Sequence, residues 1–436
     1  TFFSFIMKYH NSSLTITIYM AMTDQIIYKI SHLANSNLDG WLLDQCIIVK
    51  NGIISDIIHR DKLSKDLISN SKVVSLGDGY MLPGLIETHA HFQFSATSNA
   101  YDIYFKENPA QLMDRAKKNA KTALLSGVTT VRELGAPNDL IFPLKNNIDQ
   151  NKILGPDILP TGTPITIENG HCWFFGSVAT TTNEIFNVIE NQLSLGATHI
   201  KIMASGGYFT PSSNPRIAQY SPSVIKDVVN FCEKNGTYLC AHTLSAESTS
   251  ACIDGGVHNV IHGRWFDSSV EKSYSFDDKY AKMIVDKNIY VDSTISKHLL
   301  EYESKLKGEE QREPNSNVKR SEPTYKEIIE IFRTLDDSGV KIIGALDMGM
   351  AKALFNKAAA SAWVHKEWLG FDHWKAIRSV TSLNAEALRI ADIKGAIKKN
   401  YIADLVVFEK DPAKNIRNLT FSPASVIKHG NLIKAN

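Results

Sequence analysis

Apolar runs alternate with segments of helical periodicity over most of the chain after residue 82. Apolar positions recur at helical spacing over 111–126, 184–195, 223–235 and 246–254, and a glycine follows each of these segments. Short apolar runs of strand character lie at 128–134, 159–165, 198–205, 237–243, 257–263, 290–296 and 340–347. Repeated units of this kind are typical of α/β proteins with a parallel sheet, and we expect a (β/α)8 TIM barrel over 83–394.

Both ends of the chain have a different pattern, in which short strands follow one another without helices. Apolar and polar positions alternate in short strands over 25–75, where Asn51-Gly52 forms a hairpin turn between two apolar runs. The chain returns to strands at 394–412 and 422–435. We therefore expect the ends, 23–82 and 395–436, to form one small β-sandwich domain, with Pro83-Gly84 as the entry into the barrel.

Two segments fit neither pattern. Residues 1–22 begin with Thr and contain Met7, Met20 and Met22 as possible starts, so we interpret them as a translated extension, with a secretory signal as the alternative. A cytoplasmic location is expected, or export if this stretch is a signal. Residues 301–323 are charged and contain proline, and we interpret them as a solvated loop, with a lid over the barrel mouth as the alternative.

Composition narrows the classes of protein and partner. Of 436 residues, 43% are hydrophobic and 21% charged, as in ordinary globular enzymes. The 47 basic and 46 acidic residues leave a net charge of +1, so we expect neither a nucleic-acid nor a membrane partner. The 5 cysteines show no CxxC spacing, which argues against a disulfide framework and a cysteine zinc site. The expected partners are a small-molecule substrate and, in a homo-oligomer, further copies of the chain.

Metal-binding side chains stand where several predicted strands end. His89 and His91 are two residues apart after an apolar run, so in a strand both imidazoles point to one face and reach one metal ion. The others are Lys201, His242, His262 and Asp347, on what we number as the fourth, fifth, sixth and eighth barrel strands. Barrel enzymes place their chemistry at the carboxyl ends of the strands, so these residues predict a metal site.

A family resemblance rests on several motifs in order. These are LPGLIETHAH, GVTTVREL, IKIMASGG, AHT, IHG, LDMG, TSLNAEALRI and ADLVVFEKDP. Together they resemble the amidohydrolase superfamily, in particular its metal-dependent dipeptidases and carboxypeptidase-like, or prolidase-like, members. The resemblance covers roughly residues 25–436.

The resemblance implies two zinc ions per chain. His89, His91 and Asp347 would hold the more buried ion and His242 and His262 the other, with Lys201 bridging them as a carbamate formed with CO2. A carboxylated lysine offers two anionic oxygens to the dications, which an ammonium cannot do.

The implied reaction is hydrolysis of an amide bond, most plausibly of a dipeptide or N-acyl amino acid. The two ions would acidify a bridging water to hydroxide, and Asp347 would accept its proton and pass it to the leaving amine. His171, in a GHC motif after the third strand, would contact the substrate carbonyl or carboxylate. Tyr208, Arg216 and Tyr220, in the loop after the fourth strand, are candidate substrate-carboxylate contacts.

Departures from the family pattern leave the substrate class open. Ile261 stands where Glu is usual, Ala345-Leu346 precedes Asp347 in place of Gly-Thr, and Asn169-Gly170 replaces Gly-Gly. A cyclic amide or lactone hydrolase is therefore the alternative. A deaminase is disfavoured, because no Glu stands three residues after His242. A barrel without metal that serves as an interaction protein is disfavoured too, because every expected ligand is present.

Overall fold

The computed structural model describes residues 5–9, 12–16, 25–269, 272–296, 298, 300 and 325–435. The insertion at 301–323 and most of the N-terminal extension fall outside the described residues, so both interpretations stay predictions. Within 1–22, β1 (Phe5–Tyr9) and β2 (Ser12–Ile16) pair antiparallel.

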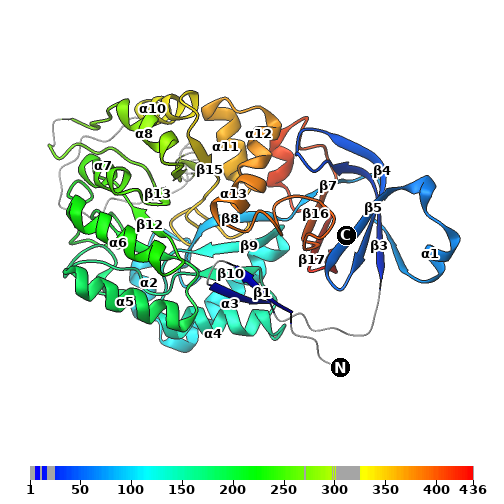
Figure 1. The fold of residues 1–436 in the computed structure, drawn as a ribbon, viewed down its shortest axis with the longest axis horizontal. Helices are drawn as coiled ribbons and strands as arrows, with labels where there is room; N and C mark the ends of the chain where they lie inside the picture. Colours follow the sequence, from blue (N-terminus) through cyan, green and yellow to red (C-terminus); the bar gives the residue numbers. More distant parts are fainter. Residues whose placement is uncertain are drawn as a thin grey trace.

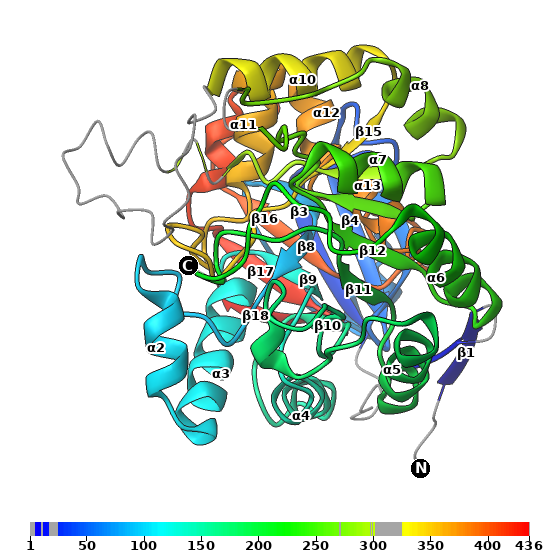
Figure 2. The same ribbon diagram turned by 90° about the vertical axis from the view of Figure 1, so that its left-hand side faces the viewer.

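Parallel strands form the centre of the larger part of the molecule. One sheet has the order β10-β9-β8 and a second, five-stranded sheet runs from β11 to β15. The bounds are β8 (Leu85–Ala90), β9 (Val128–Glu133), β10 (Asp157–Pro160), β11 (Ile200–Met203), β12 (Leu239–His242), β13 (Asn259–Ile261), β14 (Tyr290–Asp292) and β15 (Lys341–Ile343). Figure 2 views these strands nearly end-on, with helices around them.

Backbone hydrogen bonds join the two parallel sheets at both edges. Ile165 N donates to Lys201 O at 2.9 Å, and Met203 N donates to Ile165 O at 2.8 Å. At the other edge His91 N donates to Met348 O at 2.8 Å, and Met348 N donates to His89 O at 2.9 Å. The residues that follow β8 and β15 are therefore neighbours, although the sequence separates them widely.

Helices cover the outside of the parallel strands (Figures 1 and 2). They are α2 (Ala100–Lys106), α3 (Pro109–Leu125), α4 (Asn138–Asp149), α5 (Thr182–Leu195), α6 (Pro222–Lys234), α7 (Ala246–Gly255), α8 (Lys279–Asp286), α10 (Tyr325–Asp337), α11 (Ala360–Leu369), α12 (His373–Arg378) and α13 (Ser382–Ala387). Local sequence sets their ends. Asn108 and Gln111 form a capping box at the start of α3, and Gly196 ends α5 with a left-handed φ of 101°. The helices expected at 111–126, 184–195, 223–235 and 246–254 are confirmed within a few residues.

Strands from both chain ends share one eight-stranded sheet, on the right in Figure 1. Its order is β18-β17-β16-β7-β3-β4-β5, and β6 pairs with β3 off this path. The bounds are β3 (Ile26–Ala34), β4 (Trp41–Lys50), β5 (Ile53–His59), β6 (Lys72–Ser75), β7 (Tyr80–Pro83), β16 (Leu405–Phe408), β17 (Ser425–Lys428) and β18 (Asn431–Ala435). The Asn51-Gly52 turn does join an antiparallel pair, with positive φ at both residues. Short helical segments η1 (Arg60–Lys62), α1 (Lys65–Ser69), η2 (Trp173–Phe175) and η3 (Ile416–Thr420) complete the fold.

The regular strands are shorter than the apolar runs that predict them. In the run expected at 159–165, the regular strand ends at Pro160. Gly162, at a φ of 76°, turns the chain, and Ile165 then pairs with Ile202 as an isolated bridge. The run at 257–263 is a strand only from Asn259 to Ile261, since His262 and Gly263 both have positive φ. Apolar character therefore extends into loops that leave the sheet while still buried.

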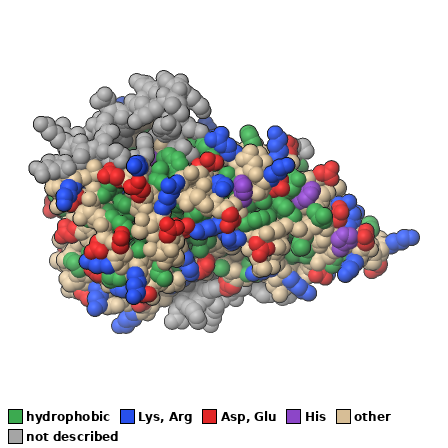
Figure 3. Space-filling model, turned by 90° about the horizontal axis from the view of Figure 1, so that it is seen from above, with side chains coloured by type: hydrophobic (Ala, Val, Ile, Leu, Met, Phe, Trp, Pro, Cys, Tyr) green, Lys and Arg blue, Asp and Glu red, His purple; other side chains and the backbone are tan. Residues whose placement is uncertain are grey.

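The distribution of charged side chains on the surface agrees with the net charge of +1 (Figure 3). Lys and Arg are interspersed with Asp and Glu over the described part of the face in Figure 3. Among the described helices, none combines the length and the apolar character needed to cross a membrane.

Candidate metal centre

The predicted ligands come together at the carboxyl ends of the parallel strands. His89 lies in β8 and His91 one residue beyond it, and their Nε2 atoms lie 3.3 and 3.5 Å from Oδ1 of Asp347. Asp347 follows β15, so the first and last parallel strands face each other here. Ligands about 2.0 to 2.2 Å from a tetrahedral zinc ion lie about 3.4 Å apart, close to these separations.

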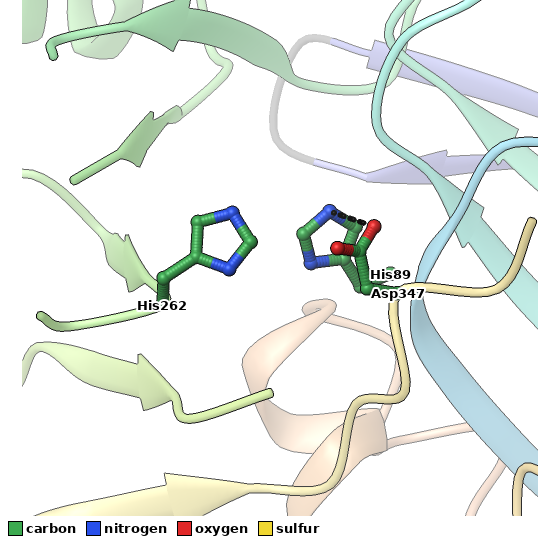
Figure 4. A group of neighbouring side chains, drawn as sticks. All are labelled: His89, His262 and Asp347. Carbon is green, nitrogen blue, oxygen red and sulfur yellow. Dashed lines mark ion pairs between the residues drawn. The ribbon is translucent and has the colours of Figure 1, made fainter. Parts of the chain in front are cut away.

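A second histidine pair lies beside the first. His262 Nε2 is 3.0 Å from His242 Nδ1, and the rings of His262 and His89 are 5.2 Å apart. Ligand atoms of His89, His262 and Asp347 all lie within 4.8 Å of one another. Figure 4 shows His262 facing His89 and Asp347, with the ion pair between the latter two dashed.

The remaining ring nitrogen of each histidine is held by the protein. The contacts are His89 Nδ1 with Asp292 Oδ2 at 2.9 Å, His91 Nδ1 with Gly135 O at 2.9 Å, His262 Nδ1 with Thr294 Oγ1 at 2.9 Å, and His242 Nε2 with Gly206 O at 3.2 Å. Such contacts orient metal-binding imidazoles and select their tautomer. Each ring therefore turns its other nitrogen toward the centre.

Lys201 lies in β11, opposite Cys240 of β12, and its side chain is 1% exposed. Burial lowers the pKa of its amine from 10.5 to about 8. Within the described part of the chain, Nζ makes no hydrogen bond or ion pair. Only the neutral amine reacts with CO2, so a depressed pKa favours the carbamate chemistry expected of this residue.

The donor set fits a divalent cation. Burial lowers the pKa of His89, and it lowers those of His242 and His262 well below 6.5, so neutral imidazoles present lone pairs at neutral pH. Imidazole nitrogens and carboxylate oxygens are the donors that zinc binds in catalytic sites.

Two of the predicted ligands have a strained backbone. His262 and Asp347 adopt φ values of 69° and 63°, which L-residues rarely occupy. Strain of this kind costs about 1 to 3 kcal/mol and concentrates at functional sites. It turns both side chains inward just after their strands end.

Similarity to known proteins agrees with this geometry. Residues 80–433, from β7 to β18, match the Amidohydrolase family. The chain belongs to the amidohydrolase family. The predicted resemblance to that superfamily is confirmed, and the protein is a hydrolase of this family.

Individual amidohydrolases show the same relationship. Ochratoxinase of Aspergillus niger is 24% identical over 387 residues, covering 80% of this chain and 74% of that protein. Its crystal structure superposes with a TM-score of 0.78 over 95% of this chain and 97% of that chain, at 20% identity. A Xaa-Pro dipeptidase with bound methionine superposes with a TM-score of 0.81 at 24% identity, covering 94% of this chain and 100% of that chain.

His171 stands beside this amidohydrolase centre, in the loop between β10 and α5. Its ring lies 4.6 Å from that of His242, and its Nδ1 is buried without a hydrogen-bond partner among the described residues. Burial, followed by the charge of Lys201, lowers its pKa to about 3, so the ring is neutral. A side chain on Gly207 would approach the ring to 2.4 Å, which leaves room there only for glycine.

The three predicted substrate contacts have protein partners. Nη1 of Arg216 donates to the carbonyls of Asp267, Ser269 and Lys272, which ties the loop after β11 to the loop after β13. The hydroxyl of Tyr220 donates to Ala179 O at 2.8 Å, and the ring of Tyr208 lies 6.0 Å from that of Phe266. Their substrate roles stay predictions.

Sequence reasoning missed the residues that position the ligands. Asp292 ends β14 and holds His89, while Glu87 accepts from the backbone N–H groups of His89 and Leu346. Arg132 is fully buried and donates to Thr88 O, Cys240 Sγ and Asn259 Oδ1. Glu87 shares its strand face with His89 and His91, a signal that the alternation did contain. Asp292 and Arg132 carried no such signal.

A second group of possible ligands has a different character. Asp157, Asp404 and His429 lie close enough to hold an ion, far from the centre at the start of β10. Nζ of Lys394 contacts both carboxylates, and Nζ of Lys428 lies 2.9 Å from Asp157 Oδ1. Since ammonium groups already neutralise these acids, the cluster is a salt-bridge network between the parallel strand β10 and the eight-stranded sheet.

Proposed function

We propose that this amidohydrolase is a binuclear zinc enzyme that cleaves the amide bond of a dipeptide or N-acyl amino acid. The observation that carries the proposal is the meeting of two histidine pairs around Asp347, with Lys201 buried among the same strands. His89, His91 and Asp347 would hold one ion, His242 and His262 the other, and carboxylated Lys201 would bridge them.

Residues of the chain would carry out the proton transfers. When bound, the two cations would supply the charge that acidifies a water molecule and polarises the substrate carbonyl. Asp347 would accept the water proton on its carboxylate and deliver it to the leaving nitrogen, which departs as an amine. His171, neutral and with an Nδ1 atom that has no hydrogen-bond partner in the described part of the chain, would donate a hydrogen bond to the carbonyl oxygen or to a substrate carboxylate.

The name of the Xaa-Pro dipeptidase supports a dipeptide, while ochratoxinase shows that the family name alone does not define the substrate. A cyclic amide or lactone hydrolase with the same centre is the alternative. It would require the same ligands and differ only in the pocket.

We also propose the remaining features of the predicted organisation. The hydrogen bonds at both edges of the parallel sheets support a closed (β/α)8 barrel over 83–394. The shared eight-stranded sheet supports a composite domain of 23–82 and 395–436, which we take to be a β-sandwich. The free, buried cysteines support a cytoplasmic location, and a homo-oligomer stays a prediction.

Metal analysis and one variant test the proposal. Purified, zinc-supplemented protein should contain about two zinc ions per chain and hydrolyse members of a panel of dipeptides, N-acyl amino acids and lactones. Lys201→Ala should lower kcat by about 100-fold or more and be partly rescued by short carboxylic acids, which replace the bridging oxygens. A folded protein without metal would contradict the binuclear zinc centre, and an unchanged rate in Lys201→Ala would contradict the carbamate bridge.

A further inference from the structure

Aromatic side chains from separate segments gather beside the metal centre. Phe94 follows β8, three rings lie on α2, Phe174 lies in η2, and Phe209 lies in the loop after β11. On α2 they occupy positions 101, 104 and 105, which share one helix face. We call this set the aromatic wall: Phe94, Tyr101, Tyr104, Phe105, Phe174 and Phe209.

The aromatic wall begins at a predicted metal ligand and ends at the surface. The ring of His91 lies 5.9 Å from that of Phe94, which lies 4.6 Å from Phe209. Phe209 is 5.5 Å from Tyr101, which is 4.8 Å from Phe105. The rings thus form one unbroken series of contacts.

Exposure increases along this series. Phe94 is 2% exposed and Phe105 is 51% exposed. Leaving aromatic surface in water costs about 25 cal/mol per Å2, so an apolar series that reaches solvent beside a catalytic centre indicates a binding surface. The wall stands on segments that follow the carboxyl ends of the strands, where a barrel enzyme binds its substrate.

The geometry of the rings indicates the chemistry of the occupant. Neighbouring rings are tilted or edge-to-face, at interplanar angles of 53° for Phe94 with Phe209 and 72° for Tyr101 with Phe209. A further flat ring can join such an arrangement, and each aromatic pair adds about 0.5 to 1.5 kcal/mol beyond the area buried. An aliphatic group would gain only the area.

We propose that the aromatic wall binds an aryl group carried by the amide substrate. This inference rests on the proposed function, because it assigns the substrate class of the same centre. It names Phe209 as a specificity-determining residue, since its ring contacts Phe94, Tyr101 and Phe174.

Ligand binding tests the wall independently of catalysis. Benzoate, cyclohexanecarboxylate and acetate carry the same carboxylate. Their Kd values for zinc-loaded protein, measured by calorimetry, therefore give the contribution of the aromatic ring to the affinity. Benzoate should bind about 3- to 10-fold more tightly than the other two, as expected for one aromatic pair. Phe209→Leu, which keeps apolar volume, should remove most of this advantage. Phe421→Ala, at a ring 60% exposed elsewhere on the chain, should retain it.

Kinetics supply the second measurement. We expect kcat/KM to favour N-benzoylglycine over N-acetylglycine, or N-acetylphenylalanine over N-acetylalanine, and Phe209→Leu to reduce the favoured ratio about 3-fold or more. Equal Kd values for benzoate and acetate, or equally tight cyclohexanecarboxylate, would overturn the aryl assignment. If no amide is hydrolysed but benzoate binds as expected, the proposed function fails and the wall stands.

Discussion

Single residues at the centre are held in place by neighbours that never reach the metal positions. Asp292, fully buried, accepts from His89 Nδ1 and from the backbone N–H of Thr294, whose hydroxyl contacts His262. One carboxylate thus links a predicted ligand of the first parallel strand to the loop that holds a predicted ligand of the sixth. Asp292 therefore acts by positioning His89, whose Nε2, the predicted metal ligand, faces Asp347.

Asp292→Asn should therefore weaken metal binding more than folding. The amide keeps the shape but loses the charge that fixes the His89 tautomer, and we expect zinc affinity to fall about 10- to 100-fold. Competition with a chromogenic chelator would measure this. The exposed Asp277→Asn is the matched control, and equal zinc affinities in the two variants would contradict the role of Asp292.

At the scale of elements, loops after the strands complete the centre. The loop after β11 carries Gly206, whose carbonyl contacts His242, and Gly207, which packs against the His171 ring. A loop from the third strand and a loop from the fourth therefore fit against each other without room for a Cβ atom. This contact determines where His171 stands.

Gly207→Ala should displace His171 and lower kcat. A Cβ atom would lie 2.4 Å from the ring, so the ring or the loop must move, and we expect about a 10- to 100-fold loss with retained zinc. Gly40→Ala, whose Cβ would meet its first neighbour at 3.4 Å, should behave as wild type. Steady-state kinetics with metal analysis would separate misplacement from metal loss, and unchanged kcat in Gly207→Ala would exclude a role for this fit.

At the scale of the whole molecule, the salt-bridge network joins the parallel strands to the eight-stranded sheet. Asp157 begins β10, Asp404 directly precedes β16, and Lys428 ends β17. Nζ of Lys394 donates to Asp157, Asp404 and Thr130. Breaking a buried pair by removing one partner leaves uncompensated charge. The network therefore specifies how the two parts meet.

Lys394→Met should destabilise the protein by about 3 to 5 kcal/mol, since both carboxylates would lose a buried partner. Lys341→Met removes a half-exposed pair with Glu386 and should cost at most about 1 kcal/mol. Urea unfolding would compare them. Equal losses would mean that the network contributes no more than a surface pair.

The same network predicts how stability depends on pH. Burial alone would raise the pKa of Asp157, but His429, Lys394 and Lys428 hold it well below 3.8, so its contribution is present above that pH and is lost as pH falls further. Burial would lower the pKa of Lys394, yet Asp157 and Asp404 raise it above 10.5, so its contribution is lost as pH rises beyond that value. Unfolding free energies from pH 3 to 11 should fall at both ends, and less steeply in Lys394→Met.

The sequence by itself determined where the parallel strands lie, the ends of α3, α5, α6 and α7 within a few residues, and the strand positions of the predicted ligands. Periodicity, caps and glycines act locally, and a parallel barrel brings the carboxyl ends of its strands together, so residues such as His242 and His262 could be placed without a structure. Family membership followed from motifs in order.

Only the tertiary structure decided which partners hold those ligands. Asp292 and Arg132 lie far from their partners along the chain, the carbonyls that bind Arg216 belong to another loop, and the aromatic wall draws on segments separated by about a hundred residues. Side-chain contacts between distant strands depend on strand order, register and the path of each loop, and no local pattern encodes these. The pair His89 and His91 was evident in the chain, whereas the carboxylate of Asp292 that orients His89 was not.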